Sequence, residues 1–504
     1  MRQLTLTIAL LGSWSWSAAA RAADLDVGQG QTYATIQSAV ADAVAGDVVR
    51  VHAGEYTEDL DLTQSGSSGS PITLQSAGDG AVTLRGSVKL AGDYWHIADL
   101  TVIVQGDVRG FDIDGSYNRL YRLDLSGGAN NGVDGSGNGN EIHECKIHGF
   151  DAGLEDAHCI VLNQNVSDWV IEGNELYDCS GDGIQLYSDG PTRTIKNTRI
   201  EGNTFRYTGA IQRMENAIDV KDADGLVIVG NQMSGFSQNK TMVFQKAPTT
   251  IEVRCNVMYD GSTGVEFRGE MGGTVENVTF VHNLMHDFTE YALKFDGTVG
   301  ATVVSNTFVD AQSDGLRIEG LSLTGGVIRN NLWLRTGGLD TGTLTADHNG
   351  FWDVGTNQIA SATDVNEDPL LDAAFHLSAS SPMIDKGIET GEPFFGAAPD
   401  LGAHEVGLEA CQAASGGAGG AGGAGVGPGG AGGGNGAAGP GSGPSTGSGS
   451  GGAGDPEDDS GCSCRAAGWS PTSSGNAALL AAMAMAAALV RRRRPAGRGL
   501  HHDG

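Results

Sequence analysis

The stretch Ile171-Glu172-Gly173-Asn174 decides the fold, because its closing asparagine returns at near-regular intervals along the chain. Counted from Asn174, the intervals are 29, 28, 25, 27, 23 and 25 residues, and the later copies end at Asn203, Asn231, Asn256, Asn283, Asn306 and Asn331. Repeats of this length are typical of a parallel β-helix, in which each coil stacks on the one before. Asparagine suits such a turn because it tolerates left-handed backbone angles and its amide can hydrogen-bond neighbouring turns. The sequence therefore predicts an all-β parallel solenoid over about residues 48–405.

A second repeat, of alternating apolar and polar residues, lies between the asparagine turns. In Gly264-Val265-Glu266-Phe267-Arg268, a period of two directs Val265 and Phe267 inward and their polar neighbours outward into solvent. The inward positions are predicted to form one stack of Ile218, Val220, Met242, Phe244, Val265, Phe267, Leu293 and Phe295. The outward positions form two columns with members roughly 4.8 Å apart from coil to coil. The first column contains Gln185, Asp219, Val243, Glu266, Lys294 and Arg317, and the second contains Tyr187, Lys221, Gln245, Arg268, Asp296 and Glu319.

The N-terminal region differs from the repeats. Residues 1–23 combine Arg2, an apolar stretch and a small-residue cleavage site at Ala20-Arg21-Ala22, which predicts a signal peptide and export. Residues 35–45 are predicted to form a short amphipathic helix that covers the open end of the solenoid. The solenoid domain is placed at residues 24–410.

The C-terminal region has a different composition again. Residues 411–460 are dominated by Gly, Ala, Ser and Pro, which predicts a flexible tether. Residues 461–504 contain Cys462 and Cys464, an apolar run and four consecutive arginines. The apolar run is shorter than the about 20 residues of a stable membrane span, which favours a sorting signal held only briefly as a transmembrane helix. This order of features resembles the myxobacterial C-terminal sorting tail, which implies attachment to the cell envelope, display at the cell surface and an anchor at one of the two cysteines.

Charge and cysteine content limit the partners. The net charge of −31 makes nucleic-acid binding unfavourable, and a polyuronate substrate would require a local basic patch or bound calcium. Export permits disulfides among Cys145, Cys159, Cys179, Cys255 and Cys411, although buried thiols fit the coils equally well. The chain is expected to be a monomer.

The ends of the solenoid resemble a known family. The entrance Ala43-Val44-Ala45-Gly46-Asp47-Val48-Val49-Arg50-Val51 and the later Gly92-Asp93-Tyr94-Trp95-His96-Ile97 look like the start of secreted right-handed parallel β-helix polysaccharide lyases. The resemblance is to the alginate lyase and chondroitinase B family, with pectate lyases as relatives. It implies a right-handed solenoid that acts on an acidic polysaccharide by β-elimination at a uronate.

The resemblance also implies a set of site residues. Glu215-Asn216-Ala217-Ile218-Asp219-Val220-Lys221 is similar to the family's base strand, which makes Lys221 the candidate general base. Glu215, Asn216 and Asp219 are then the candidate calcium ligands. In the family, the next coil carries an arginine that can serve as the acid. This chain has Gln245 there, so the candidate assisting cations are Arg268 and Lys246. Tyr187, Gln245 and Lys294 are the candidate substrate-binding residues.

Physical chemistry explains why such a cluster is needed. Elimination removes a weakly acidic proton beside a carboxylate, so a cation must stabilise the enolate while a base takes the proton. Lysine serves as a base near neutral pH only if its pKa is depressed, and Asp219 would oppose this unless calcium neutralises it.

Other functions remain open. Paired charges such as Asp219 with Lys221, and Glu266 with Arg268, are also typical of a solvated surface with modest ion pairs. The same tether and tail fit a non-catalytic glycan-binding adhesin or a structural surface protein. A uronate C5-epimerase would use the same residues as a lyase.

Overall fold

The computed structural model describes residues 22–320 and 322–408. The predicted signal peptide lies outside these residues except for its last two positions, and the predicted tether and sorting tail lie wholly outside them. No helix in the described ranges is long and apolar enough to cross a membrane.

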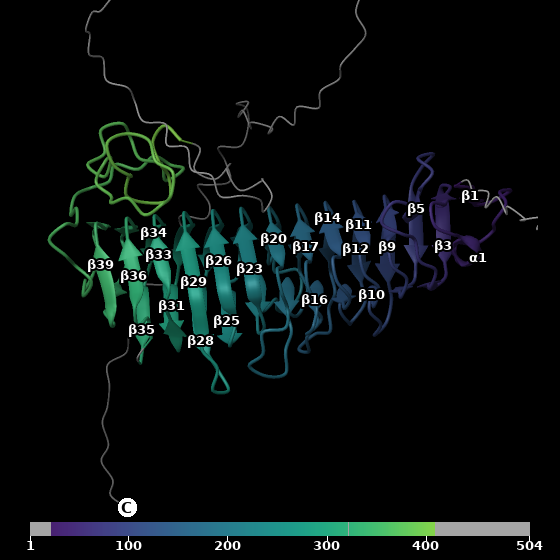
Figure 1. The fold of residues 1–504 in the computed structure, drawn as a ribbon, viewed down its shortest axis with the longest axis horizontal. Coiled ribbons are helices and arrows are strands. Elements are labelled where there is room, and N and C mark those ends of the chain that lie inside the picture. The colour runs from purple at the N-terminus through teal and green to yellow at the C-terminus, as the bar shows by residue number, and fades with distance from the viewer. Residues whose placement is uncertain (1–21, 321, 409–504) are drawn as a thin grey trace, which may run out of the picture. The chain divides into compact units, whose positions relative to one another are not determined.

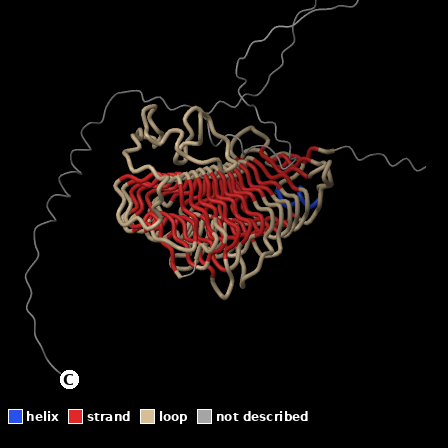
Figure 2. The backbone as a smooth tube through the Cα atoms, turned by 60° about the vertical axis from the view of Figure 1, so that its left-hand side comes forward, coloured by secondary structure: helices blue, strands red, loops and turns tan. Residues whose placement is uncertain are grey.

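The described chain is a right-handed parallel β-helix built from three sheets whose strands pair in parallel from coil to coil (Figures 1 and 2). This confirms the predicted fold class. Each coil contributes in turn to sheet A, sheet B and sheet C, so strands neighbouring in a sheet are one coil apart in sequence.

Sheet A has 15 strands. They are β1 (Asp24–Val27), β2 (Val48–Val51), β5 (Ile72–Ser76), β8 (Trp95–Ala98), β11 (Arg119–Tyr121), β14 (Glu141–His143), β17 (Val170–Glu172), β20 (Arg199–Glu201), β23 (Asp224–Val229), β26 (Thr249–Arg254), β29 (Val275–Val281), β32 (Thr298–Val299), β33 (Thr302–Val304), β36 (Gly326–Arg329) and β39 (Leu344–Asp347).

Sheet B has 13 strands. They are β3 (Gly54–Thr57), β6 (Val82–Arg85), β9 (Thr101–Val104), β12 (Asp124–Gly127), β15 (Lys146–His148), β18 (Glu175–Tyr177), β21 (Thr204–Arg206), β24 (Gln232–Ser234), β27 (Val257–Gly261), β30 (Leu284–Phe288), β34 (Thr307–Ala311), β37 (Leu332–Leu334) and β40 (Gly350–Trp352).

Sheet C has 12 strands and carries the predicted columns. They are β4 (Leu60–Leu62), β7 (Val88–Leu90), β10 (Phe111–Ile113), β13 (Val133–Gly135), β16 (Ile160–Leu162), β19 (Ile184–Leu186), β22 (Ile218–Val220), β25 (Lys240–Lys246), β28 (Thr263–Gly269), β31 (Tyr291–Asp296), β35 (Asp314–Glu319) and β38 (Gly338–Leu339).

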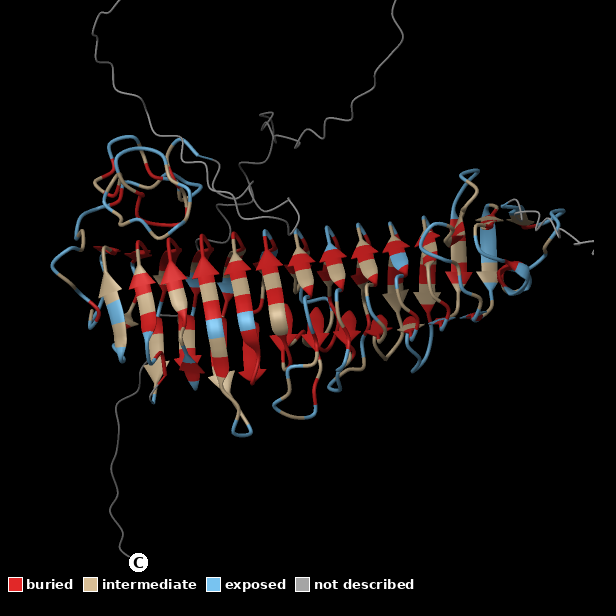
Figure 3. Cartoon of the chain, in the orientation of Figure 1, coloured by how far each residue is buried: buried red, intermediate tan, exposed pale blue. Residues whose placement is uncertain are grey.

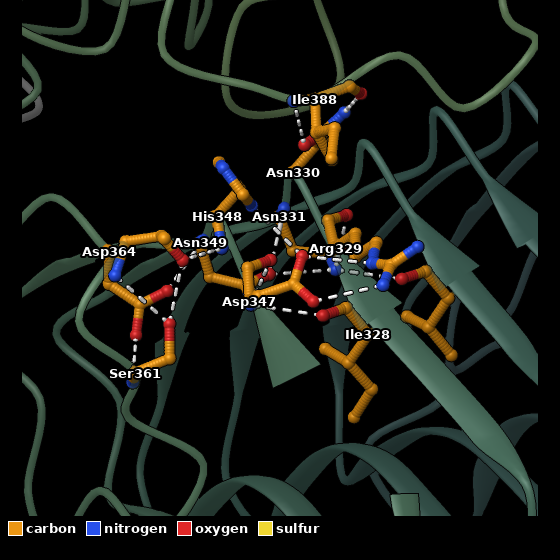
Figure 4. A network of polar contacts seen from close by, with 12 residues as sticks. Ile328, Arg329, Asn330, Asn331, Asp347, His348, Asn349, Ser361, Asp364 and Ile388 are labelled. Carbon is orange, nitrogen blue, oxygen red and sulfur yellow. Dashed lines mark hydrogen bonds and ion pairs between the residues drawn. The ribbon is translucent and has the colours of Figure 1, made fainter. Parts of the chain in front are cut away.

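The asparagine repeat forms a continuous buried ladder between sheets A and B. Each amide Nδ2 donates to the Oδ1 of the asparagine one coil later, from Asn174 to Asn203 at 2.9 Å and onward. The ladder continues to Asn349, which the repeat did not reveal, at 3.1 Å from Asn331 (Figure 4). The amide contacts predicted from the sequence are therefore present.

The predicted backbone reason for asparagine is corrected by the structure. The left-handed residue is the one before each ladder asparagine, as at Gly173 with φ 67° and Cys255 with φ 57°. Ladder asparagines themselves are absent from the described residues that have positive φ. The amide's ability to satisfy buried backbone groups, and not its tolerance of positive φ, is what selects asparagine here.

The inward positions form the predicted apolar stack. All eight predicted residues are fully buried, and the rings of Phe244, Phe267 and Phe295 lie one above another with centroids 4.5 and 5.1 Å apart. Identical spacing of the coils brings equivalent side chains together, which is why a period-two pattern predicts this core.

A helix covers the N-terminal end of the solenoid, and the C-terminal segment packs against the outer side of sheet B. Helix α1 (Ile36–Asp42) lies at the N-terminal end, with Thr35 as its N-cap and Ile36, Ala39 and Val40 buried. At the other end the strands stop at Trp352, and residues 353–408 form turns that pack against β34 and β37 through Leu377, Met383 and Leu401. Backbone and side-chain amides of Ile388 and Asn330 exchange hydrogen bonds of 2.7 and 2.9 Å, which fixes this segment to the ladder turn (Figure 4).

The cysteines differ in state. Cys159 and Cys179, on successive coils, form a disulfide. Cys255 is also disulfide-bonded, whereas Cys145 is a buried free thiol. Cys411 lies outside the described residues.

Candidate functional site

Sheet C contains a polar cleft at β22, β25 and β28, with a volume of about 250 Å³. Six of the predicted site residues line it, together with three that sequence reasoning did not select. The nine are Glu215, Asn216, Asp219, Lys221, Asn239, Lys240, Val243, Gln245 and Arg268.

The middle of the first outward column is buried in and beside this cleft, which corrects the expectation that these positions face solvent. Asp219 is 3% exposed, Val243 2% and Glu266 4%. Figure 3 shows β25 and its neighbours in sheet C largely in the colour of buried residues. The segments that precede β22 and β25 supply Glu215, Asn216 and Asn239 to the lining. A period-two pattern cannot predict such walls, because they come from loops.

A chain of contacts joins two of the three predicted catalytic cations, Lys221 and Arg268. The Lys221 Nζ lies 3.1 Å from Asp219 Oδ2, and Gln245 Nε2 donates to Asp219 Oδ1 at 2.6 Å. Arg268 Nη2 donates in turn to Gln245 Oε1 at 3.0 Å. Gln245 therefore bridges the base strand to the arginine two coils away.

Charge is poorly balanced around Asp219. Burial and the neighbouring charge of Asp182 raise the pKa of Asp219 to about 6, against the opposing effect of Lys221. Burial lowers the pKa of Lys221, but the attraction of Asp219 outweighs this and leaves that pKa above its ordinary value. Lys221 is therefore an ammonium group at neutral pH in this structure, as expected if nothing neutralises Asp219.

The acidic part of the cleft contains oxygen atoms that can accept further hydrogen bonds or bind a cation. Asn216 donates from Nδ2 to Asp182 at 2.7 Å, while its Oδ1 is buried without a hydrogen-bond partner among the described residues. Burial and the charges of Asp182 and Asp156 raise the pKa of Glu215, although Arg213 lies 3.1 Å from it.

The oxygen donors of this part of the cleft are of the type that calcium binds. Hard oxygen ligands from two carboxylates and an amide suit that ion, and the raised pKa values of Asp219 and Glu215 indicate a shortage of positive charge. Residues 22–320 and 322–408 contain no cluster of three or more His, Cys, Asp or Glu side chains arranged for a metal. A cation here would therefore depend on the amide oxygen of Asn216.

Three other predicted residues lie outside the cleft lining. Lys246 is buried, has φ 67°, and its Nζ donates to the carbonyl of Ser188. The Tyr187 hydroxyl donates to Asp189. Lys294 Nζ lies 2.9 Å from Glu266 Oε1, with which it forms an ion pair.

Two residues that support the site, Lys240 and Asp182, are not among the predicted site residues. Lys240 begins β25 and lies 3.5 Å from Glu266, and it adds a third cation to the cleft lining after Lys221 and Arg268. Asp182 is fully buried and accepts hydrogen bonds from Asn216 and Gln185, which positions both. The signal for Asp182 is its place in Gly181-Asp182-Gly183, one coil before Glu215-Asn216.

Comparison with known proteins locates this architecture. The family model described as right handed beta helix region matches residues 91–235 and 216–359, and the chondroitinase B model matches residues 31–120. The curated proteins give no significant match.

Several solved structures share the fold at low identity. A PL6 family alginate lyase, AlyGC, is 14% identical with a TM-score of 0.52, over 71% of this chain and 55% of that chain. A pectate lyase is 17% identical with a TM-score of 0.38, over 73% and 90% of the two chains. The A-module of a mannuronan C-5 epimerase from Azotobacter vinelandii is 14% identical with a TM-score of 0.41, over 66% and 94%. At these identities the likeness shows the fold alone.

Proposed function

This chain belongs to the right-handed beta helix family, and we propose that its sheet C cleft acts on an acidic polysaccharide by β-elimination at a uronate. The observation that carries the proposal is the pair of half-buried Lys221 and buried Asp219, in a cleft that also contains the unpartnered amide oxygen of Asn216. Perturbed, buried titratable groups in one cleft are typical of catalytic sites. The matched chondroitinase B model and the alginate lyase fold support the substrate class.

The reaction gives each residue a role. A neutral Lys221 would take the proton from C5 of the uronate, the C4–C5 double bond would form, and the bond from C4 to the leaving oxygen would break. The resulting ammonium of Lys221 could return the proton to that oxygen. Arg268, held by Gln245, would orient the substrate carboxylate, since guanidinium groups bind carboxylates in a fork.

Calcium held by Glu215, Asn216 and Asp219 would supply positive charge for the enolate and for Asp219. Without such a charge, Asp219 holds Lys221 in its protonated form. Turnover is therefore expected to require the cation.

The test is an absorbance assay for unsaturated uronates with the full chain on alginate, polygalacturonate and chondroitin. We expect product with calcium and loss of turnover with a chelator. If no polymer gives product while at least one binds, the lyase assignment fails.

A second function has one observation in its favour. The raised pKa of Lys221, under the charge of Asp219, and glutamine at the position of the family's arginine both favour binding without turnover, as in an adhesin. Saturable binding of a polyuronate with neither elimination nor epimerisation at C5 would select this alternative. Exchange of the C5 proton for solvent deuterium without new unsaturation would select the epimerase.

Location follows from the chain ends. We propose that the protein is exported by residues 1–23 and attached to the cell envelope by residues 461–504, with residues 411–460 as a spacer. Deleting residues 461–504 should release the solenoid into the medium. A mature protein found in the cytoplasm would contradict this location.

A further inference from the structure

A larger cavity lies on a different face of the solenoid from the cleft. It is a hollow of about 750 Å³ on the outer side of sheet A, across β5, β8, β11, β14 and β17. Four of these strands are labelled along one face in Figure 1. Ligand sites for small molecules have volumes of about 300–1,000 Å³, so the hollow has the capacity of an oligosaccharide or similar ligand.

The hollow exists because short side chains adjoin long ones. Ala98 is in register with Gln75 on one side and Tyr121 on the other, so its methyl group leaves a gap in the outer surface of the sheet. Arg122 and Glu144 also line the hollow, next to Tyr121.

The charges around the hollow are paired with one another. Arg119 lies 2.7 Å from Glu141, and Arg122 forms a two-point contact with Asp99 at 2.6 and 2.7 Å. The Tyr121 hydroxyl donates to Glu144 at 3.0 Å. An ionic ligand would have to break such pairs, which makes it a poor match.

The uncharged polar side chains are the ones left free. Thr73, Gln75 and His96 line the hollow, and within the described ranges none of their side chains has a hydrogen-bond partner. Burial, with the nearby charge of Arg119, lowers the pKa of His96, so its imidazole is neutral and can both donate and accept. Hydroxyl, amide and neutral imidazole groups together match the hydroxyl groups of a sugar.

We propose that this hollow binds a neutral oligosaccharide. The free hydrogen-bonding groups are uncharged, the charged groups are already satisfied, and the open face admits a chain that runs along the solenoid axis. This site is independent of the cleft, because it lies on another sheet and shares no residue with it.

The experiment is calorimetric titration of the full chain with cellohexaose, maltohexaose, mannohexaose and chitohexaose, and with hexagalacturonate as the anionic comparison. We expect at least one neutral hexasaccharide to bind, and Ala98→Trp, which fills the hollow, to weaken that binding at least tenfold. The double variant His96→Ala, Gln75→Ala should weaken it by a similar factor without adding volume, which covers the case in which Ala98→Trp fails to fold. Thr279→Ala, at an outward position of β29 beyond the hollow, is the matched control and should bind normally.

The outcomes separate cleanly. Absence of saturable binding to all four neutral hexasaccharides overturns the proposal, and so does binding that a folded Ala98→Trp leaves intact. Binding restricted to hexagalacturonate overturns it as well and points to the sheet C cleft. Because the cleft assay uses polyuronates, failure of either proposal leaves the other standing.

Discussion

The cleft of sheet C and the hollow of sheet A lie on different coils of one solenoid, and their charged groups are balanced to different degrees. In the cleft, Asp219 is 3% exposed and its pKa rises to about 6 because its surroundings supply too little positive charge. Around the hollow, the side chains of Arg119 and Arg122 are 52% and 45% exposed, and each is paired with a carboxylate. An outward position on a coil is thus not defined by its strand alone. The loops beside the strand determine whether the side chain at that position is exposed to solvent or buried.

The largest effect is expected from Lys221→Ala, which tests whether the cleft is catalytic. If the cleft is catalytic, turnover on the best uronate polymer should fall by about 10²–10⁴-fold, because Lys221 is the proposed proton-transfer group. Binding of that polymer should change little, since the group acts mainly in the transition state. Arg317→Ala, at an outward position of the same sheet, is the control and should retain turnover. Turnover retained in Lys221→Ala would place the chemistry elsewhere.

The next effect concerns the scaffold that both regions share. In Asn256→Ala, the buried N–H groups of Asn231 lose their acceptor, which should lower the free energy of unfolding by about 2–5 kcal/mol. Denaturant unfolding followed by circular dichroism measures this. The exposed Gln232, beside the ladder, should tolerate alanine within about 0.5 kcal/mol. Equal costs for the two variants would mean that the ladder is not a source of stability.

A third prediction tests whether an ion pair on the outer surface of sheet A stabilises the folded protein. Glu392 of the C-terminal segment meets His282 and Arg254, and the hydrogen bond from His282, followed by Arg254, lowers its pKa to about 2 despite partial burial. A lowered carboxyl pKa contributes stability above the unfolded value of 4.5 that is lost as pH falls toward about 2. Glu392→Gln should therefore cost about 2 kcal/mol at pH 7 and progressively less below pH 4.5. A cost that does not vary between pH 7 and pH 2.5 would contradict the ion pair.

The smallest expected effect supplies the missing charge to the cleft. Gln245→Arg places a guanidinium beside Asp219, where Gln245 now donates at 2.6 Å, and should lower the pKa of Asp219 from about 6. Turnover should rise by about tenfold if the family's arginine position is functional here. Gln232→Arg, on another sheet, controls for the added charge. Titration of Asp219 by NMR and the uronate assay report the two changes separately, and an unchanged pKa would refute the charge argument.

Much of the fold could be predicted because the same local sequence pattern recurs in successive coils, so each coil supports the prediction made from the others. The asparagine interval predicted the ladder, and the alternation around Phe244, Phe267 and Phe295 predicted the stacked core. The missed element is the pair formed by each asparagine and the left-handed residue before it, such as Gly173 or Cys255. Because that residue varies in type, no single-letter pattern marks it.

The site was predicted only in part, for physical reasons. Lys221, Asp219 and Gln245 line one cleft, because the register between coils that the period predicts places β22 beside β25, while the chemical roles that the resemblance implies for them stay predictions. Lys246 was selected for its charge, yet the strand's alternation gives it the inward parity of Phe244, and the turn at φ 67° directs it to Ser188. The hollow of sheet A was missed although its cause, a small Ala98 between Gln75 and Tyr121, is visible once coils are aligned.

The asparagine ladder has a direction, and this direction has a consequence for how the chain is assembled. Each ladder asparagine from Asn174 to Asn331 donates its backbone N–H and one side-chain N–H to the Oδ1 of the asparagine one coil later, and the backbone N–H of Asn349 donates to the carboxylate of Asp364 at 2.9 Å. A coil that emerges first therefore waits for its acceptor until the following coil arrives. If the chain assembles from its N-terminus, the newest ladder asparagine has no acceptor for these N–H groups until the next coil is added. Each added coil supplies the acceptor for the coil before it, and Asp364 supplies it for the backbone N–H of Asn349.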